Sequence, residues 1–549
     1  MIKLTELHFI FLSLKHNFSF YHNNHYKTSL NIFLNKTNKD MNKLLLLFSI
    51  SLFISASFCE ECVASEDERL DCGYMGIDES TCVSKGCCWT PTQAGGVPWC
   101  YKPGHPKLNC PNFNVEVTDP GFTSSDVEKM KGYFRANINI QGKGGVAAAN
   151  DHSTPGGDYF FHWARDGALS MKSYMIFNDM KYDAIKTDMD AYVDWVLRAE
   201  DKFENGVDIR IEPRFYLPDG NLFTGGWCRP QTDAPGLRAT TLSMYGMILL
   251  ENGQEDYAKG KIYNAIKHDL EWVMSSWSQD SCDLWEEVRS NDFFWGRYTM
   301  RKGLLEAAKF MDKIGDSNLS GQYRSKAKEI ENTLDSHWNG SFMFESQNRQ
   351  KDSAVISAFI EGYAEDDYLS PLDTKVAGTL KAFNTLFCRT YKINQDDSDN
   401  NVPGVLHGRY EGDGYAGGNP WVLTTANVAK VYYRGAAYLA EMQRKNKKLT
   451  DEQYKAWSEV VGENNSRFGF LQSRELNLAN SLTLAGDSVM QRIYHHVKND
   501  DCHLNEQIDR NSGVQTAAKD LTWSYSSVLV AMKIREQARE AIDILANIK

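Results

Sequence analysis

Long helical patterns separated by long, aromatic loops dominate the sequence from about residue 110 to residue 549. In each pattern apolar residues recur every three or four positions, which places them on one face of an α-helix. We expect about eleven such helices, at residues 125–138, 182–203, 237–251, 255–277, 297–314, 320–338, 377–391, 422–443, 450–463, 485–497 and 521–548. No run of alternating strands accompanies them. The pattern predicts an all-α domain, and a toroid of paired helices with its loops gathered at one end would explain it.

Residues 62–100 have a different composition, with six of the twelve cysteines at positions 62, 72, 82, 87, 88 and 100. Six cysteines allow fifteen pairings, and spacing alone does not choose among them. So small a module buries too little core to fold alone, so disulfides worth ~2–5 kcal/mol each should stabilise it. A zinc site is a further interpretation of these cysteines, but the adjacent Cys87-Cys88 pair disfavours it. Prolines and a glycine at 101–107 mark the end of this module.

The N-terminal region predicts export. Residues 1–40 lack a domain-like pattern and are interpreted as a non-native or unusual leader. Met41 begins a charged start, an apolar run at 44–54 and small residues at 55–57, which is typical of a signal peptide, here 41–59. The run is too short to span a membrane, so no membrane anchor is expected. The cysteines agree with a secreted protein or one of the lysosome or vacuole lumen, and Asn318, Asn339 and Asn464 begin glycosylation sequons.

The charge and composition exclude some functions. The formal net charge of −12 argues against a nucleic-acid partner, because phosphate neutralisation needs clustered Lys and Arg. Aromatic residues make up 12% of the chain. Most belong to a packed core, although a surplus would suit stacking against sugar rings.

Four loop clusters combine carboxylates, arginines and tryptophans, at residues 158–166, 212–238, 283–288 and 505–525. Glycosidic cleavage needs one carboxylic acid to protonate the leaving oxygen and one carboxylate to activate water or attack carbon. The clusters offer such a set. Taken alone, they are better explained as a solvated network of salt bridges.

The cysteine-rich region resembles a P-type, or trefoil, domain through Gly86-Cys87-Cys88-Trp89 and Pro98-Trp99-Cys100. The resemblance implies the disulfides Cys62–Cys88, Cys72–Cys87 and Cys82–Cys100. Two roles for the module, placed at 60–103, stay open. It is either a rigid N-terminal cap, or it contacts a glycoprotein or polysaccharide through an aromatic cleft that includes Trp99.

The remainder, placed at 104–549, is similar to glycoside hydrolase family 15, the glucoamylases. Five blocks carry the resemblance in order: Asp158-Tyr159…Trp163-Ala-Arg165-Asp166, Trp227-Cys-Arg229-Pro-Gln, Asp283-Leu-Trp285-Glu286-Glu287-Val, Arg409-Tyr…Tyr415…Gly418-Asn-Pro-Trp421, and Glu506-Gln507…Asp520-Leu-Thr-Trp523-Ser-Tyr. The family implies an (α/α)6 toroid and release of glucose from the non-reducing ends of starch, glycogen or maltooligosaccharides. The substrate partner would be an α-glucan oligosaccharide or polysaccharide, with no cofactor, no metal and a monomeric enzyme.

The resemblance also implies a role for individual residues. Glu286 would protonate the glycosidic oxygen, and Glu506 would deprotonate water. Other positions would bind substrate: Tyr159, Trp163, Arg165, Asp166, Trp227, Arg229, Trp285, Glu287, Arg409, Trp421, Gln507 and Trp523. Arg165 and Asp166 would hold the terminal glucose, and Tyr159 would lie under the reacting ring.

These roles carry physical expectations. The acid should have a raised pKa, because it must stay protonated, whereas the base should lie in a wetter place and remain ionised. Carboxyls about 6.5–9.5 Å apart would leave room for water and give inversion to β-glucose. The chain departs from the family pattern at Cys228, where glycine is usual, and at Ile508, which replaces a tyrosine. No separate starch-binding domain is expected after the catalytic region.

Three other functions remain open. The first is another family 15 activity, such as a trehalase or glucodextranase, with the same catalytic pair. The second is a non-catalytic carbohydrate-binding or adhesion protein, which both retained glutamates disfavour. The third is a retaining α-glucosidase, whose alternating strands and helices the helical texture disfavours.

Overall fold

The computed structural model describes residues 62–66, 69–74, 76–92, 97–104, 110, 117–154, 157–200, 208–462 and 473–547. The expected leader and signal peptide, Cys59 and the Asn464 sequon lie outside the described residues. Asn318 and Asn339, which begin the other two sequons, are exposed.

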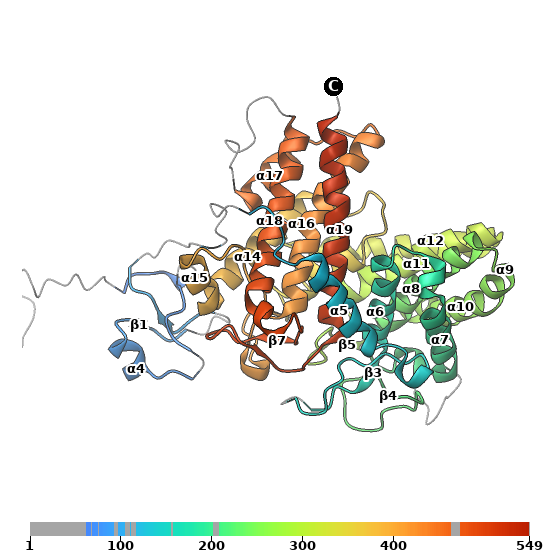
Figure 1. Cartoon of the computed structure of the whole chain (residues 1–549), viewed down its shortest axis with the longest axis horizontal. Helices are drawn as coiled ribbons and strands as arrows, with labels where there is room; N and C mark the ends of the chain where they lie inside the picture. Colours follow the sequence, from blue (N-terminus) through green and yellow to red (C-terminus); the bar gives the residue numbers. More distant parts are fainter. Residues whose placement is uncertain are drawn as a thin grey trace, which may run out of the picture. The chain divides into compact units, whose positions relative to one another are not determined.

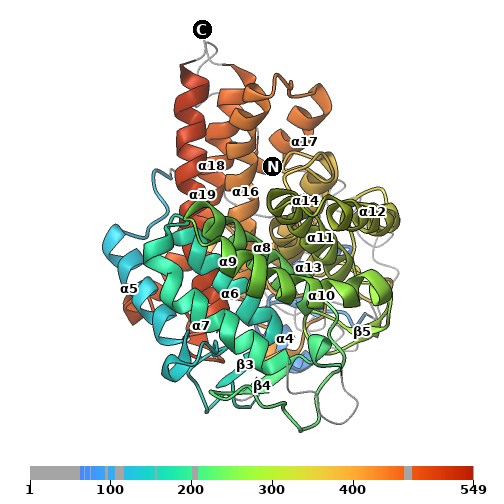
Figure 2. The same cartoon turned by 90° about the vertical axis from the view of Figure 1, so that its right-hand side faces the viewer.

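Six helices pack against one another in a closed ring, and each contacts the next: α6 (Ala164–Phe177), α8 (Ala234–Glu251), α11 (Phe294–Ile314), α13 (Ala354–Glu361), α16 (Val422–Arg444) and α19 (Thr522–Ala546). An outer helix precedes each of them: α5 (Ser124–Ala136), α7 (Tyr182–Glu200), α10 (Tyr263–Ser276), α12 (Ser317–Leu334), α14 (Thr374–Thr390) and α18 (Arg474–Val497). The views agree that α16, α18 and α19 lie side by side (Figures 1 and 2). This is the expected all-α (α/α)6 toroid. Because outer and inner helices alternate, the inner six all run in the same direction.

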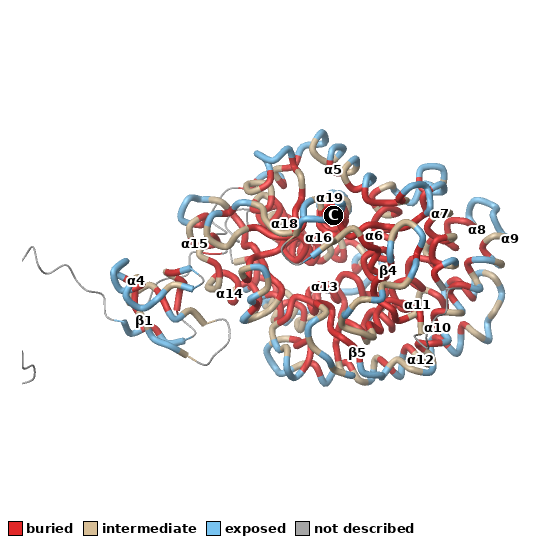
Figure 3. The backbone as a smooth tube through the Cα atoms, turned by 90° about the horizontal axis from the view of Figure 1, so that it is seen from below, coloured by how far each residue is buried: buried red, intermediate tan, exposed pale blue. Residues whose placement is uncertain are grey.

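Burial separates the two rings. Every residue of α13 and nearly every residue of α6 is buried, as expected of helices surrounded by other helices. By contrast, α12 buries a single stripe that includes Tyr323, Ala327 and Ile330. In Figure 3 the inner helices are almost continuously red, whereas α5, α9 and α12 show exposed stretches. One continuous apolar core therefore joins the rings.

The structure adds helices to those expected from periodicity. Helices α6, α13 and α15 (Lys392–Asp399) are absent from the expected set, and α18 begins at Arg474 rather than at 485. The range 255–277 is divided into α9 (Glu255–Tyr257), a π-helical turn at Ala258–Ile262, and α10. Helices α13 and α15 have eight residues each, which is too short for a period of 3.6 residues to be recognised, and α6 is buried on nearly all sides and so has almost no polar face. Helix α17 (Asp451–Val461) packs on α14 and α18.

Short antiparallel strand pairs stiffen the loops. They join β3 (Phe161–Trp163) to β4 (Arg214–Tyr216), β5 (Ser281–Cys282) to β6 (Arg289–Ser290), and β7 (Gln507–Ile508) to β8 (Gln515–Thr516). In the cysteine-rich module, helix α4 (Glu79–Ser84) accompanies β1 (Cys88–Trp89) and β2 (Cys100–Tyr101).

Five disulfides are present. Three lie in the module and are the pairs that the resemblance implied, Cys62–Cys88, Cys72–Cys87 and Cys82–Cys100. Two tie the helical domain, Cys110–Cys388 and Cys228–Cys282, and Cys502 is a buried free thiol. Within the described ranges, no helix has the length and apolarity needed to cross a bilayer.

Candidate active site

A cleft of about 240 Å³ opens where the inner helices begin. Its charged and aromatic lining comes from the loops that lead into those helices, and the complete lining is Ala148, Asp158, Tyr159, Trp163, Arg165, Asp166, Trp227, Leu284, Trp285, Glu286, Glu287, Arg409, Tyr415, Trp421, Leu423, Glu506, Leu521 and Trp523. Trp163 and Trp421 are the residues that cap the N-termini of α6 and α16. The parallel course of the inner helices therefore gathers four distant sequence clusters in one place, with the positive ends of the helix dipoles toward it.

Glu286 is presented by the turn between β5 and β6, at a positive φ of 68°. Trp227 Nε1 donates a hydrogen bond to its Oε2 at 2.9 Å, and Gln231 Nε2 donates to Oε1 at 2.9 Å. Arg165 Nη2 lies 3.3 Å from Oε1. Burial raises the pKa of Glu286 and outweighs Arg165 and these donors, which lower it. The carboxyl is thus biased toward the protonated form, as expected of a general acid.

Arg165 links Glu286 to the buried carboxylate of Asp233. Its Nη1 donates to Gln231 Oε1 at 2.9 Å and to Asp233 Oδ2 at 3.1 Å. Asp166, the next residue in α6, lies 3.8 Å from Arg165 Nε, and burial raises its pKa to about 7. Asp233 also accepts from Trp295 Nε1 at 2.8 Å. The guanidinium is therefore held in place before any ligand arrives.

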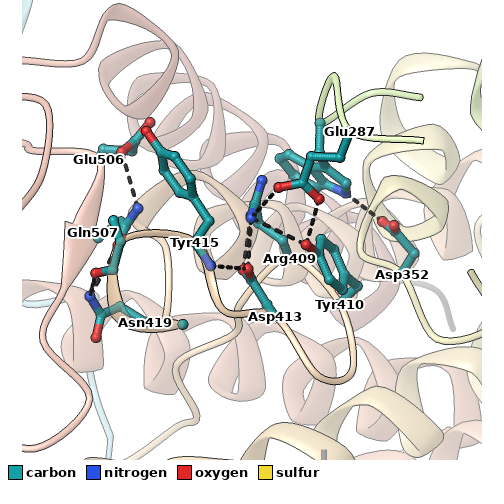
Figure 4. A network of polar contacts seen from close by, with 12 residues as sticks. Glu287, Asp352, Arg409, Tyr410, Asp413, Tyr415, Asn419, Glu506 and Gln507 are labelled. Carbon is teal, nitrogen blue, oxygen red and sulfur yellow. Dashed lines mark hydrogen bonds and ion pairs between the residues drawn. The ribbon is translucent and has the colours of Figure 1, made fainter. Parts of the chain in front are cut away.

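Glu506 lies across the cleft, before β7. Tyr159 donates its hydroxyl to Oε1 at 2.9 Å, and Gln507 Nε2 donates to Oε2 at 3.1 Å. Asn419 in turn donates to Gln507 Oε1 at 3.0 Å, which orients the amide (Figure 4). The expectation of a wetter base is wrong. Glu506 is only 2% exposed, and burial raises its pKa to about 7 against Tyr159, Arg409 and Gln507.

The base is drier than expected because the loops enclose both carboxyls in one cleft. Tyr415 covers the Glu506 side, with its hydroxyl 2.8 Å from that of Tyr159. Burial raises the pKa of each carboxyl separately, so that each keeps its proton to a higher pH than an exposed glutamate does. Both groups are thus poised for proton transfer.

Glu287 differs from its neighbour. Burial raises its pKa, but Arg409, Arg349 and Tyr410 lower it by a larger amount, so its pKa lies below the ordinary value. Arg409 Nη2 is 2.8 Å from Glu287 Oε1 and 2.6 Å from Asp413 Oδ1, and Tyr410 donates its hydroxyl to Glu287 (Figure 4). Glu287 is therefore a fixed anion that can accept hydrogen bonds but has no proton to give.

Aromatic rings form the walls. The Arg214 guanidinium is surrounded by four of them, at 3.8 Å from Phe161, 4.5 Å from Trp163, 4.3 Å from Phe223 and 4.3 Å from Trp227. On the opposite side Trp285 and Trp421 meet edge to face at 5.7 Å, and Trp285 Nε1 donates to Asp352 at 2.7 Å. Flat apolar faces beside charged groups suit a sugar, whose ring has C–H faces and an edge of hydroxyls.

Nearly all of the residues predicted from the sequence line the cleft, but Arg229 and Gln507 do not. Arg229 turns away to Glu212, 2.8 Å distant, and to the carbonyls of Phe223 and Gly225. Gln507 does not line the cleft but donates a hydrogen bond to Glu506. The Cys228–Cys282 disulfide explains the unusual cysteine, because it ties the Trp227 loop to the strand that leads to Glu286.

The prediction also missed residues. Gln231 donates to Glu286, Asp233 accepts from Arg165, and Tyr415 contacts the hydroxyl of Tyr159. All three lie inside or beside the quoted motifs, so proximity in sequence was the available signal. Among the described residues, the sulfurs of Cys82, Cys87 and Cys100 are the one group with metal-binding spacing, and all three are in disulfides.

Comparison with known families gives two matches. Residues 132–533 match the model of glycosyl hydrolases family 15, and residues 62–103 match the trefoil (P-type) domain.

Similar proteins include the glucoamylase of Blastobotrys adeninivorans, 31% identical over 83% of this chain and 78% of that protein. Glucoamylase 1 of Rhizopus oryzae is 31% identical over 74% of this chain and 70% of its own length. Among solved structures, the glucoamylase of Saccharomycopsis fibuligera superposes with a TM-score of 0.67 at 25% identity, covering 77% of this chain and 97% of that one.

Proposed function

Because the chain belongs to glycosyl hydrolases family 15, we propose that it is a glucoamylase, a glucan 1,4-α-glucosidase that releases β-D-glucose from the non-reducing ends of α-glucans. The observation that carries the proposal is the placement of two buried carboxyls with raised pKa values, Glu286 and Glu506, in one cleft lined by tryptophans. Starch, glycogen and maltooligosaccharides are the substrate class.

Glu286 donates its proton to the glycosidic oxygen as the bond to the leaving chain breaks. Its contacts with Arg165, Trp227 and Gln231 then stabilise the carboxylate that forms. This lowers the barrier, because donors already aimed at a developing charge need no reorganisation.

Glu506 takes a proton from the attacking water on the other face of the sugar. Tyr159 and Gln507 each donate to a different oxygen of Glu506 and so fix the orientation of the carboxylate. An attack opposite to the departing group inverts the anomeric centre and yields β-glucose.

The charged residues around this pair hold the terminal glucose. Arg165 and Asp166 offer a donor and an acceptor on one side, and Glu287 with Arg409 offers the same combination on the other. Tyr159, Trp163, Trp285, Trp421 and Trp523 supply the ring contacts.

Proton NMR of the fresh product from maltotriose tests the proposal. We expect β-glucose from the wild type and a loss of about 10²–10⁴-fold in Glu286→Gln. An initial α-anomer would contradict the inverting mechanism. Glucose released from trehalose or from α-1,6 glucans, but not from maltotriose, would identify another family 15 activity.

We also propose that the mature enzyme is exported as a monomer, either secreted or in a lysosome or vacuole lumen. Its trefoil module would occupy 60–103 and its catalytic domain 104–549. The five disulfides and the exposed Asn318 and Asn339 support this. We expect the protein in the culture medium to lose apparent mass when it is treated with an enzyme that removes N-linked glycans.

The trefoil module would contact the polysaccharide. A groove of about 610 Å³ is lined by Tyr74, Trp89 and Trp99 of the module and by Tyr391, Tyr410, Asp413 and Arg510 of the helical domain, among others. Trp99 and Tyr74 are 45% and 47% exposed. Tyr410 also donates to Glu287 of the cleft, so one side chain borders both hollows. A glucan chain leaving the cleft could therefore extend along the groove.

Trp99→Ala tests this contact. We expect a several-fold higher KM for glycogen with little change for maltose, because maltose is too short to reach the module. Val83→Ala, at an exposed position of α4 outside the groove lining, is the control. Equal effects on both substrates would contradict the contact.

A further inference from the structure

A second cavity, of about 420 Å³, lies deeper along the inner ring. Its walls come from α6, α8, α11, α13, α16 and α19, with Lys172, Lys302 and Arg434 among the lining side chains. Lys172, Lys302 and Lys430 are each the ninth residue of their inner helix. At 1.5 Å per residue this layer is about 12 Å from the helix N-termini that surround the active site.

The lysines of this layer are strongly buried. Lys302 is 8% exposed and Lys430 is 2% exposed. Charged amines at such depth are costly unless an opposite charge pairs with them. Their partners therefore decide what the cavity can hold.

One carboxylate serves two of these lysines. Glu361 pairs with Lys172 and lies 3.3 Å from Lys430. The trio therefore keeps one excess positive charge. The shared carboxylate has a pKa of about 2, because the surrounding lysines outweigh its burial.

Two more cations have no anionic partner in the part of the chain that the structure describes. Lys302 makes no hydrogen bond or ion pair there, and the Arg434 guanidinium, whose Nε is buried, has only the ring of Tyr363 6.0 Å away. Glu306 pairs with Lys309, and Lys533 pairs with Asp179 and Glu536. The one unpaired acid in the lining is Glu365, which is exposed at the rim. The lining as a whole holds four basic and four acidic residues, but Lys302 and Arg434 are left without a direct ion-pair partner.

The dipoles of their own helices do not explain the presence of these unpaired cations. Cations are favoured near helix C-termini, but the effect falls off within the last turn. Lys302 and Lys430 lie in the middle of α11 and α16, and Lys172 and Arg434 are also more than one turn from the ends of their helices. An anion entering the cavity would supply the missing partner.

We propose that this cavity binds a small molecule through a phosphate group held by Lys302, Arg434 and Lys172. The phosphate pairs with the two cations that lack a direct partner, and the remaining volume accommodates the rest of the ligand, since small-molecule pockets have about 300–1,000 Å³. The site lies on the same six helices as the active site, so a ligand there stabilises the folded ring.

Thermal unfolding of the full chain with inorganic phosphate is the first test. At constant ionic strength, we expect millimolar phosphate to raise the Tm of the wild type more than chloride does. Lys302→Met and Arg434→Gln should each lose most of that increase. Lys313→Met, at an exposed position of the same helix α11, should keep it. An unchanged response in Lys302→Met, or no phosphate response in the wild type, would overturn the proposal.

Sulfate provides a second test, because its charge is constant between pH 6 and 9. Burial and the charge of Lys172 lower the pKa of Lys302 to about 7, and Arg434 acts in the same direction against Glu306 and Glu361. An anion needs the protonated amine, so calorimetry should show sulfate binding that weakens as the pH rises through about 7. Binding that is independent of pH would contradict the role of Lys302.

Discussion

The inner helices carry opposite chemistry at two levels. At their N-termini lie Glu286, Glu506, Asp166 and Glu287, supported by Arg165 and Arg409. One layer deeper lie Lys172, Lys302 and Lys430 around the single acid Glu361. Most of the upper groups belong to loops, although Arg165 and Asp166 lie in the first turn of α6, whereas the three lysines lie inside helices.

The difference shows how one ring accommodates two kinds of buried charge. Loop residues can be repositioned around a substrate, and their donors are directed at the carboxyls. Lysines in the middle of a helix have fixed backbones. Their buried charge can be relieved only by sharing a neighbouring carboxylate or by losing a proton. We therefore expect changes at the upper level to affect catalysis, and changes at the lower level to affect stability.

The largest expected effect is the loss of the base. Glu506→Gln should lower kcat on maltotriose by about 10²–10⁴-fold while the thermal unfolding curve changes little. Glutamine keeps the shape and the contacts with Tyr159 but accepts no proton from water. Glu536→Gln, at an exposed position of α19, is the control. A loss below tenfold would show that another group activates the water.

Glu361→Gln should be the most destabilising change at the lower level. It leaves Lys172 and Lys430 without their shared carboxylate, and breaking a buried pair costs about 3–5 kcal/mol. Urea unfolding at neutral pH measures it. The activity per folded molecule should be unchanged. If stability is retained and activity lost, the two levels are not separate.

Lys302→Met should have the opposite sign. The amine titrates near pH 7 in the folded protein and near 10.5 when unfolded, so it opposes folding fully below about pH 7. The opposition weakens as the pH rises from about 7 toward 10.5. Without added phosphate, the variant should therefore be more stable by about 1–4 kcal/mol at pH 6, and by less at pH 9. Urea unfolding at both values checks this, and destabilisation at pH 6 would contradict it.

Trp227→Phe should have the smallest effect. It removes the donor to Glu286 Oε2, which favours the ionised form. The pKa of Glu286 should rise, so the alkaline limb of the pH profile of kcat/KM should move to higher pH. The lost contact should also lower kcat/KM by about tenfold. A downward movement of the limb would show that another group controls it.

The sequence predicted most of the architecture from particular features. Repeated apolar spacing indicated the outer helices, and the cysteine spacing with Trp89 and Trp99 indicated the module. Motif blocks indicated twelve cleft residues among the fourteen named. Helix α13 was missed, because its eight residues are too few to display the helical period.

The sequence by itself determined the helical class, the disulfide-rich module and the loops that carry the carboxylates, because periodicity and residue type are local properties. Only the tertiary structure decided that Glu506 is buried more deeply than Glu286, that Arg229 turns to Glu212, and that three lysines form one layer in which two share a single acid. Burial and charge balance depend on which distant segments meet, and no local pattern records that meeting.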